Sequence, residues 1–109
     1  MSPVAEVVVV YDVTCPQCSR IARELPDVLT VPVRVRSCRD PHVADAFPSL
    51  PAAVRRCAAP AVGVVRDGSV RWWRGRRGAI GLLPVLRRSP RAVSAAVGLW
   101  FAAARAGRA

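Results

Sequence analysis

Apolar and polar positions along the first third of the chain follow two different periods. The run from Glu6 to Tyr11 is almost wholly valine, which is typical of a strand buried on both faces of its sheet. After it, apolar side chains recur at helical spacing, with charged side chains on the opposite side: Cys18, Ile21, Ala22, Leu25, Val28 and Leu29. We therefore predict a strand followed by an amphipathic helix whose buried face includes Cys18.

This helix is predicted to begin beside two cysteines, in the stretch VTCPQCSR. Thr14 and Gln17 have the spacing of a capping box, and Pro16 is tolerated in a first turn because its missing N–H would have no helical partner there. Pro26 is expected to kink or end the helix. Beyond it, TVPVRVRSC alternates valine with arginine, which predicts a second strand and completes a βαβ unit.

The second half of the chain predicts a hairpin and further helices. A short helix is expected from a Ser49 cap to Arg56. In PAVGVVRDGSVRWWRG, two apolar runs flank Asp67-Gly68, a dipeptide suited to a tight turn with positive φ. Helical segments are expected over 77–87 and 90–105. The last of these is predicted to bury an apolar stripe made of Val93, Val97, Trp100 and Ala104.

The order of these elements is β, α, β, α, β, β, α, α, which predicts the α/β class. We expect a thioredoxin-like fold, in which helices flank a central mixed sheet of about four strands and an extra helix lies at the C-terminus. Residues 1–109 are predicted to form a single domain of this kind, because the chain contains no internal repeat and no Gly/Ser-rich linker.

Composition narrows the class of protein only slightly. The 109 residues include 17 basic and 7 acidic side chains, for a formal net charge of +10, and every basic residue is Arg. This charge would suit an anionic partner, and it equally fits arginines spread over solvated faces. The start of the chain lacks the features of a secretory signal, and the apolar segment 92–104 is too short for a membrane span. We therefore expect a cytoplasmic monomer without a membrane span.

The two close cysteines carry the main functional signal. Because cytosolic thiols are kept reduced, the four cysteines are not expected to form a disulfide framework, and Cys38 and Cys57 are interpreted as small buried apolar residues. Cys15 lies where a helix N-terminus stabilises a thiolate, and Cys18 is one turn further on. We predict that Cys15 is the nucleophile of disulfide exchange and that Cys18 resolves the mixed disulfide. Pro16 and Gln17, between them, are expected to contact the substrate.

A proline directly before the predicted hairpin strengthens this interpretation. Pro60 follows the cysteine pair in a layout that resembles thioredoxins and glutaredoxins, in which a cis-proline starts this hairpin and faces the two cysteines. The resemblance implies that the Ala59–Pro60 bond is cis. The backbone of Ala59 would then lie beside Cys15 and pair with an extended substrate.

The stretch YDVTCPQC is similar to the Asp-x-x-Cys-x-x-Cys signature of the DCC family of predicted thiol-disulfide oxidoreductases. This resemblance implies a catalytic set of Asp12, Cys15 and Cys18 that needs no cofactor and no metal. Its substrates would be disulfide-containing proteins or low-molecular-weight thiols, and an external reductant would regenerate the pair. Asp12 either exchanges a proton with Cys18 or caps the turn at Thr14–Cys15. The family usually has Gly after the Asp, whereas this chain has Val13, which resists positive φ.

Other interpretations remain open at this stage. The cysteine pair could be inert and buried, or half of a zinc site, although one close pair and two isolated cysteines is a weak zinc pattern. The stretch VRWWRGRRG interleaves Trp72 and Trp73 with arginines, as proteins that bind single-stranded nucleic acid do. A strand turns one of these rings inward, which favours a structural role. The alternative to an enzyme is therefore a basic, aromatic nucleic-acid-binding module or a purely structural thioredoxin-like module.

Overall fold

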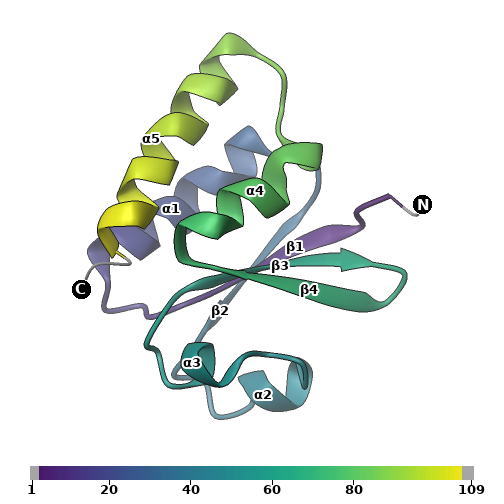
Figure 1. Cartoon of the computed structure of the whole chain (residues 1–109), viewed down its shortest axis with the longest axis vertical. Coiled ribbons are helices and arrows are strands. Elements are labelled where there is room, and N and C mark those ends of the chain that lie inside the picture. The colour runs from purple at the N-terminus through teal and green to yellow at the C-terminus, as the bar shows by residue number, and fades with distance from the viewer. Residues whose placement is uncertain (1–2, 107–109) are drawn as a thin grey trace.

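The computed structural model of the chain describes residues 3–106 and shows a four-stranded mixed sheet between two layers of helices (Figure 1). The strands are β1 (Glu6–Tyr11), β2 (Val33–Ser37), β3 (Ala61–Arg66) and β4 (Ser69–Arg74). They lie in the order β2-β1-β3-β4, with β1 and β2 parallel and the other neighbours antiparallel. This is the predicted α/β class with a central mixed sheet.

The helices divide between the two faces of the sheet, as Figure 1 shows. One face is covered by α1 (Pro16–Val28), α4 (Gly78–Leu82) and α5 (Pro90–Ala106). The other face carries α2 (Val43–Ala46) and α3 (Ala52–Arg55). Short 3₁₀ turns, η1 (Gly75–Arg77) and η2 (Leu83–Val85), flank α4. The arrangement is thioredoxin-like, and α5 is the predicted additional C-terminal helix.

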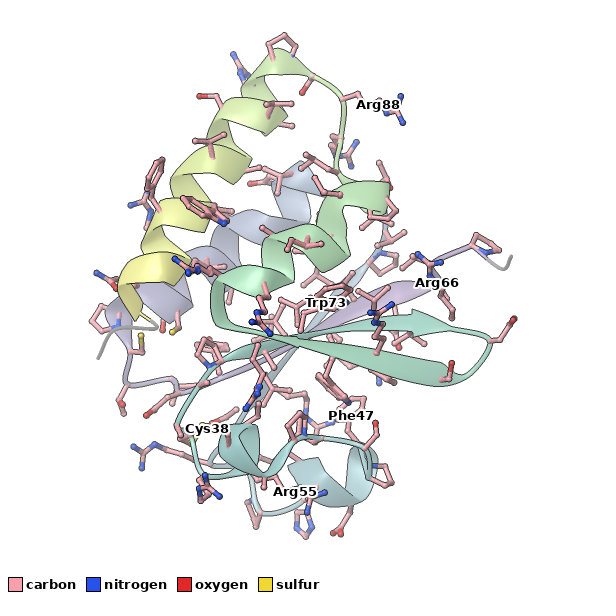
Figure 2. All side chains as sticks on the ribbon, viewed as in Figure 1. Cys38, Phe47, Arg55, Arg66, Trp73 and Arg88 are labelled. Carbon is pink, nitrogen blue, oxygen red and sulfur yellow. A yellow bond between two sulfur atoms is a disulfide. The ribbon has the colours of Figure 1, made fainter. Side chains whose placement is uncertain are left out.

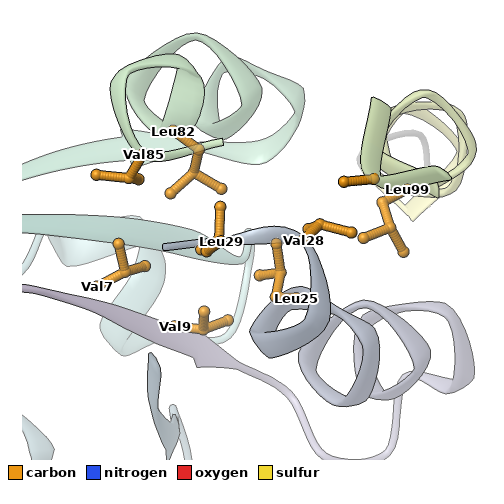
Figure 3. Close-up of a cluster of buried hydrophobic side chains, with 9 residues drawn as sticks. Val7, Val9, Leu25, Val28, Leu29, Leu82, Val85 and Leu99 are labelled. Carbon is orange, nitrogen blue, oxygen red and sulfur yellow. The ribbon is translucent and has the colours of Figure 1, made fainter. Parts of the chain in front are cut away.

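Strand β1 divides the hydrophobic core into two clusters, one on each face of the sheet. Val7 and Val9 pack with side chains of α1, α4 and α5, a cluster shown in Figure 3. Val8 and Val10 pack on the opposite face with the segment that contains α2 and α3. All four valines are at most 4% exposed, because successive side chains of a strand point to opposite faces. The prediction of a strand buried on both faces is confirmed.

Helix α1 begins at the cysteine pair, but its cap differs from the prediction. Cys15, not Thr14, is the N-cap residue, and its sulfur accepts a hydrogen bond from the backbone N–H of Cys18. The Thr14 hydroxyl instead bonds to Asp12. The helix also continues through Pro26 to Val28, because Leu25 and Val28 are buried on either side of the exposed proline and hold the last turn in place.

The hairpin β3–β4 forms at the predicted turn. Asp67 and Gly68 have φ values of 49° and 77°, the left-handed conformation that this tight turn requires. The two tryptophans of β4 point to opposite faces of the sheet. Trp72 contacts Phe47 edge to face and donates its ring N–H to Ser49. Trp73 lies under α4, where Figure 2 shows it between the hairpin and that helix.

Helix α5 contacts α1 through a different stripe from the predicted one. Ala92 and Leu99 are buried, whereas Val93, Val97 and Trp100 are 45%, 50% and 38% exposed. Ala104 lies outside the residues whose side chains are described. The predicted stripe was wrong because helical spacing alone cannot choose between two neighbouring apolar faces of an alanine-rich helix. No helix in the described part of the chain is long and apolar enough to cross a membrane.

Candidate active site

The sulfur atoms of Cys15 and Cys18 lie 2.7 Å apart at the start of α1. This separation is close to the bonding distance of about 2.05 Å, so oxidation of the two thiols by a disulfide substrate would need only a small displacement to join them. Cys15 is half-buried, and its sulfur also accepts the backbone N–H of Cys18 at 3.3 Å. Cys18 is buried on the inner side of the helix. The more accessible sulfur is therefore the one at the positive end of the helix dipole.

The pKa of Cys18 is raised to about 12, mainly by burial and also by the adjacent Cys15 sulfur and the Asp12 carboxylate. Cys18 is therefore a thiol at neutral pH, in direct contact with the Cys15 sulfur. The two cysteines have different environments: one sulfur receives hydrogen-bond donors and faces outward, while the other retains its proton and faces the core. This asymmetry suits an attacking thiol and a resolving thiol.

Asp12 organises the turn that leads into the cysteine pair. Its carboxylate accepts hydrogen bonds from the Thr14 backbone N–H at 3.0 Å and from the Thr14 hydroxyl at 2.7 Å. Its backbone carbonyl accepts the N–H of Cys15 at 2.9 Å, which closes a four-residue turn. Val13 is not among the described residues with positive φ, so the turn forms without the glycine usual in the DCC family. Two roles were considered for Asp12, proton exchange with Cys18 and capping of the turn at Thr14–Cys15, and these hydrogen bonds are those of the capping role.

Arg39 is a residue of the site that the sequence did not reveal. Its guanidinium donates two hydrogen bonds to the Asp12 carboxylate, at 3.0 and 3.1 Å. This fork, together with the Thr14 hydrogen bonds, holds the pKa of Asp12 well below its usual value, so the carboxylate stays charged at neutral pH. Arg39 carried no local signal, because it is one of many arginines and lies 27 residues from its partner.

Cys38 and Cys57 are joined in a disulfide, which corrects their interpretation as isolated apolar residues. Their Cα atoms are 5.5 Å apart, within the range that a disulfide bridges. Cys38 follows β2, where its N–H donates to the Tyr11 carbonyl directly before Asp12. Figure 2 shows Cys38 at the edge of the α2–α3 layer. The expectation of reduced thiols failed because folding places the end of β2 against the segment before β3, a contact that no local pattern announces.

The Ala59–Pro60 bond is trans, and no cis peptide occurs among residues 3–106, so the expected cis-proline is wrong. The trans form is favoured by about 0.5–1 kcal/mol unless a tight turn demands otherwise. Here Cys57, at φ 59°, makes the sharp bend before β3. Pro60 nevertheless reaches the predicted region, because it lines the same cavity as Cys18 and Tyr11. Its carbonyl accepts the Gly75 N–H at 2.9 Å.

Two of the remaining predicted substrate contacts, Pro16 and Gln17, lie next to Cys15 at the start of α1. Pro16 is exposed in the first turn of α1, and Gln17 is half-buried beside it. Ala59, predicted to pair with a substrate backbone, is half-buried directly before β3. The contact of these three residues with a substrate stays a prediction.

The arginine and tryptophan stretch is engaged within the protein. The Arg71 guanidinium lies over the Trp73 ring, 4.5 Å from its centroid. The Trp72 ring contacts Phe47 on the other face, with centroids 5.8 Å apart. These contacts support the structural role that was weighed against nucleic-acid binding.

Comparisons with protein-family models, with curated proteins and with solved structures find no match to this chain. In the described part of the chain, no three His, Cys, Asp or Glu side chains are grouped so that they could hold a metal ion. The Cys38–Cys57 bond also removes two of the four thiols that a zinc site would have used.

Proposed function

We propose that this protein is a thiol-disulfide oxidoreductase of the DCC type that cycles between a Cys15–Cys18 dithiol and disulfide. The observation that carries the proposal is the unequal pair of sulfurs, 2.7 Å apart at the N-terminus of α1. The match of Asp12, Cys15 and Cys18 to the DCC signature supports it. The substrates are disulfides of proteins or of small thiols, and the chemistry needs no cofactor beyond an external thiol reductant.

In the proposed reaction, the Cys15 thiolate attacks one sulfur of a substrate disulfide. A mixed disulfide forms, and the first substrate sulfur leaves as a thiolate that takes up a proton. Cys18 then gives up its proton and attacks the Cys15 sulfur, which releases the second substrate thiol. The substrate has gained two electrons and two protons, and Cys15 and Cys18 are joined as a disulfide. A dithiol or two equivalents of a monothiol reverse these steps on the enzyme and become a disulfide.

Asp12 has a positioning role in this proposal. Its carboxylate and carbonyl hold Thr14 and Cys15 in the turn that points the nucleophile outward. Arg39 keeps that carboxylate ionised and fixed in place. A charged carboxylate at this position also opposes the formation of a Cys18 thiolate, which keeps the resolving thiol protonated until the mixed disulfide has formed.

Oxidised glutathione and disulfide-bonded insulin are suitable probe substrates, with dithiothreitol as the reductant. We expect Cys15→Ser to abolish turnover and Cys18→Ser to trap a covalent adduct on Cys15, visible by mass spectrometry. The order of the two roles is tested because the adduct should form in one variant only. Equal adduct formation in both variants, or turnover in Cys15→Ser, would contradict the proposal, as would a native pair that never oxidises in a glutathione redox series.

A further inference from the structure

An apolar cavity of about 320 Å³ lies between α4 and α5, and α1 contributes to its inner wall. Its inner wall includes Cys18 and Leu25 of α1 and Val62 of β3. Leu83, Val97 and Trp100 also line it and are 63%, 50% and 38% exposed, so they form an open mouth. The volume is at the lower end of the range of pockets that hold small ligands.

One end of the cavity lies at the candidate active site. Figure 1 shows that the beginnings of α1 and α4 and the end of α5 lie together on one side of the molecule. Cys18, Pro60 and Arg76 come from segments at this end. The cavity is lined at its other end by Leu29, which follows α1, by Leu86, which follows η2, and by Val93 near the start of α5. The cavity is therefore an elongated apolar channel that has one end at the resolving cysteine.

The half of the chain that supplies α4 and α5 is strongly basic, whereas α1, which forms part of the inner wall, carries Glu24 and Asp27 as well as Arg20 and Arg23. The acidic residues of the chain end at Asp67, whereas nine arginines follow it, in the half of the chain that supplies α4 and α5. Arg76 is the only charged residue of the lining. Its side chain is exposed and forms no ion pair with another described residue. An occupant that is apolar along its length and negative at one end would match both the channel and this arginine.

We propose that the channel binds one molecule of a single-chain anionic amphiphile, such as a long-chain carboxylate. The head group of the amphiphile contacts Arg76 at the end of the channel that holds Cys18. Its hydrocarbon chain lies between α4 and α5 and extends toward Leu86 and Val93. A membrane surface is a poorer fit, because it would contact the exposed rim and leave the inner wall at Leu25 and Val62 unfilled. This site does not depend on the redox activity proposed above, since binding needs neither sulfur to react.

Dodecanoate is the probe, with dodecanol and dodecyltrimethylammonium as neutral and cationic probes of equal chain length, all below their micelle-forming concentrations. Calorimetry with the full chain should show one dodecanoate per protein and an affinity about tenfold above that of the cationic probe. Equal affinities for the three probes would overturn the proposal.

Matched variants locate the head group. Arg76→Gln should weaken dodecanoate binding about threefold to tenfold and leave dodecanol binding unchanged. Arg88 lies in the connection before α5, and Figure 2 shows its side chain pointing away from the body of the protein. Arg88→Gln removes the same charge and should change the binding of neither dodecanoate nor dodecanol. Equal losses in the two variants would mean that only overall charge matters. That result would overturn the assigned site.

Further measurements distinguish an amphiphile in the channel from other possible occupants. Ala96→Phe places a ring in the channel and should abolish binding of dodecanoate and dodecanol together, and if this variant does not fold, the probe series and Arg76→Gln still decide. Binding to phosphatidylglycerol vesicles without binding of monomeric dodecanoate would assign the face to a membrane instead. Dimerisation blocked by filling the channel would assign it to a second copy. Exchange with oxidised glutathione, assayed without amphiphile, tests the redox proposal separately.

Discussion

Arg39 donates a hydrogen bond to each carboxylate oxygen of Asp12, and this contact connects the segment after β2 to the turn before Cys15, the proposed nucleophile. The residue before Arg39 is Cys38, which is bonded to Cys57. The turn before the cysteine pair is thus supported by the residues that follow β2. A β-turn supported only by its own residues would be free to move, whereas this one is fixed by a forked ion pair and a disulfide next to it.

Removing the guanidinium should raise the pKa of Asp12. In Arg39→Gln we expect the pKa of the Asp12 carboxyl, measured by carbon NMR titration, to rise from well below its usual value toward that value of 3.8. The lowered pKa contributes stability above pH 3.8 that is lost as the pH falls through the folded-state value, so this contribution shrinks in the variant. Arg34→Gln, which breaks the comparable surface pair with Glu6, should leave the Asp12 titration unchanged.

The same variant tests the positioning role of Asp12. We expect Arg39→Gln and Asp12→Asn to slow reaction with oxidised glutathione in proportion to each other, because both loosen the same turn. The double variant should be no slower than the slower single variant, since the two residues act through one contact. Additive losses would show that Arg39 acts independently of Asp12, for example by attracting an anionic substrate.

The raised pKa of Cys18 predicts a distinct alkaline behaviour of the reduced protein. Cys18 should resist iodoacetamide at pH values where an ordinary thiol reacts, and become reactive only as the pH approaches about 12. The folded state holds this proton more tightly than the unfolded state. The stability it contributes is therefore fully present below pH 9.0 and is lost as the pH rises toward about 12. Cys18→Ala should lack this loss, and an identical alkaline profile in both proteins would contradict the assignment.

The Cys38–Cys57 disulfide should stabilise the fold through the loop that it closes. Its partners are 19 residues apart in sequence, and a loop of about this length corresponds to roughly 3 kcal/mol of unfolding free energy. Replacing both cysteines with alanine should lower the free energy of urea unfolding by about that amount. The Cys15→Ser/Cys18→Ser double variant is the matched control and should lose far less. Two alkylatable thiols at Cys38 and Cys57 in the native, unreduced protein would exclude the bond.

The buried stripe of α5 gives a prediction about packing. Leu99→Ala should cost about 2–5 kcal/mol of stability, because Leu99 is only 5% exposed and packs with Leu25 and Val28 (Figure 3). Val97→Ala, two residues earlier and 50% exposed, should change stability by about 0.5 kcal/mol or less. Thermal or urea unfolding measures both. The opposite ranking would restore the stripe that helical spacing predicted.

Features encoded by neighbouring residues were predictable from the sequence. The valine run of β1, the Asp67-Gly68 turn and the start of α1 at the cysteine pair all follow from side-chain periodicity and turn chemistry within a few residues. These local elements, in their order, were enough to predict the α/β class and its thioredoxin-like arrangement. They also identified the Cys15–Cys18 pair, because the spacing of one helical turn is itself local.

Only the tertiary structure decided the features that join distant parts of the chain. The Asp12–Arg39 ion pair, the Cys38–Cys57 bond and the channel between α4 and α5 each need elements far apart in sequence to meet. Many arginines and several apolar faces were available as partners, and a periodic pattern does not rank them. The choice was made by packing, because α5 buries the face that fits α1, and the residue after β2, Cys38, bonds to Tyr11 directly before the turn that leads to Cys15.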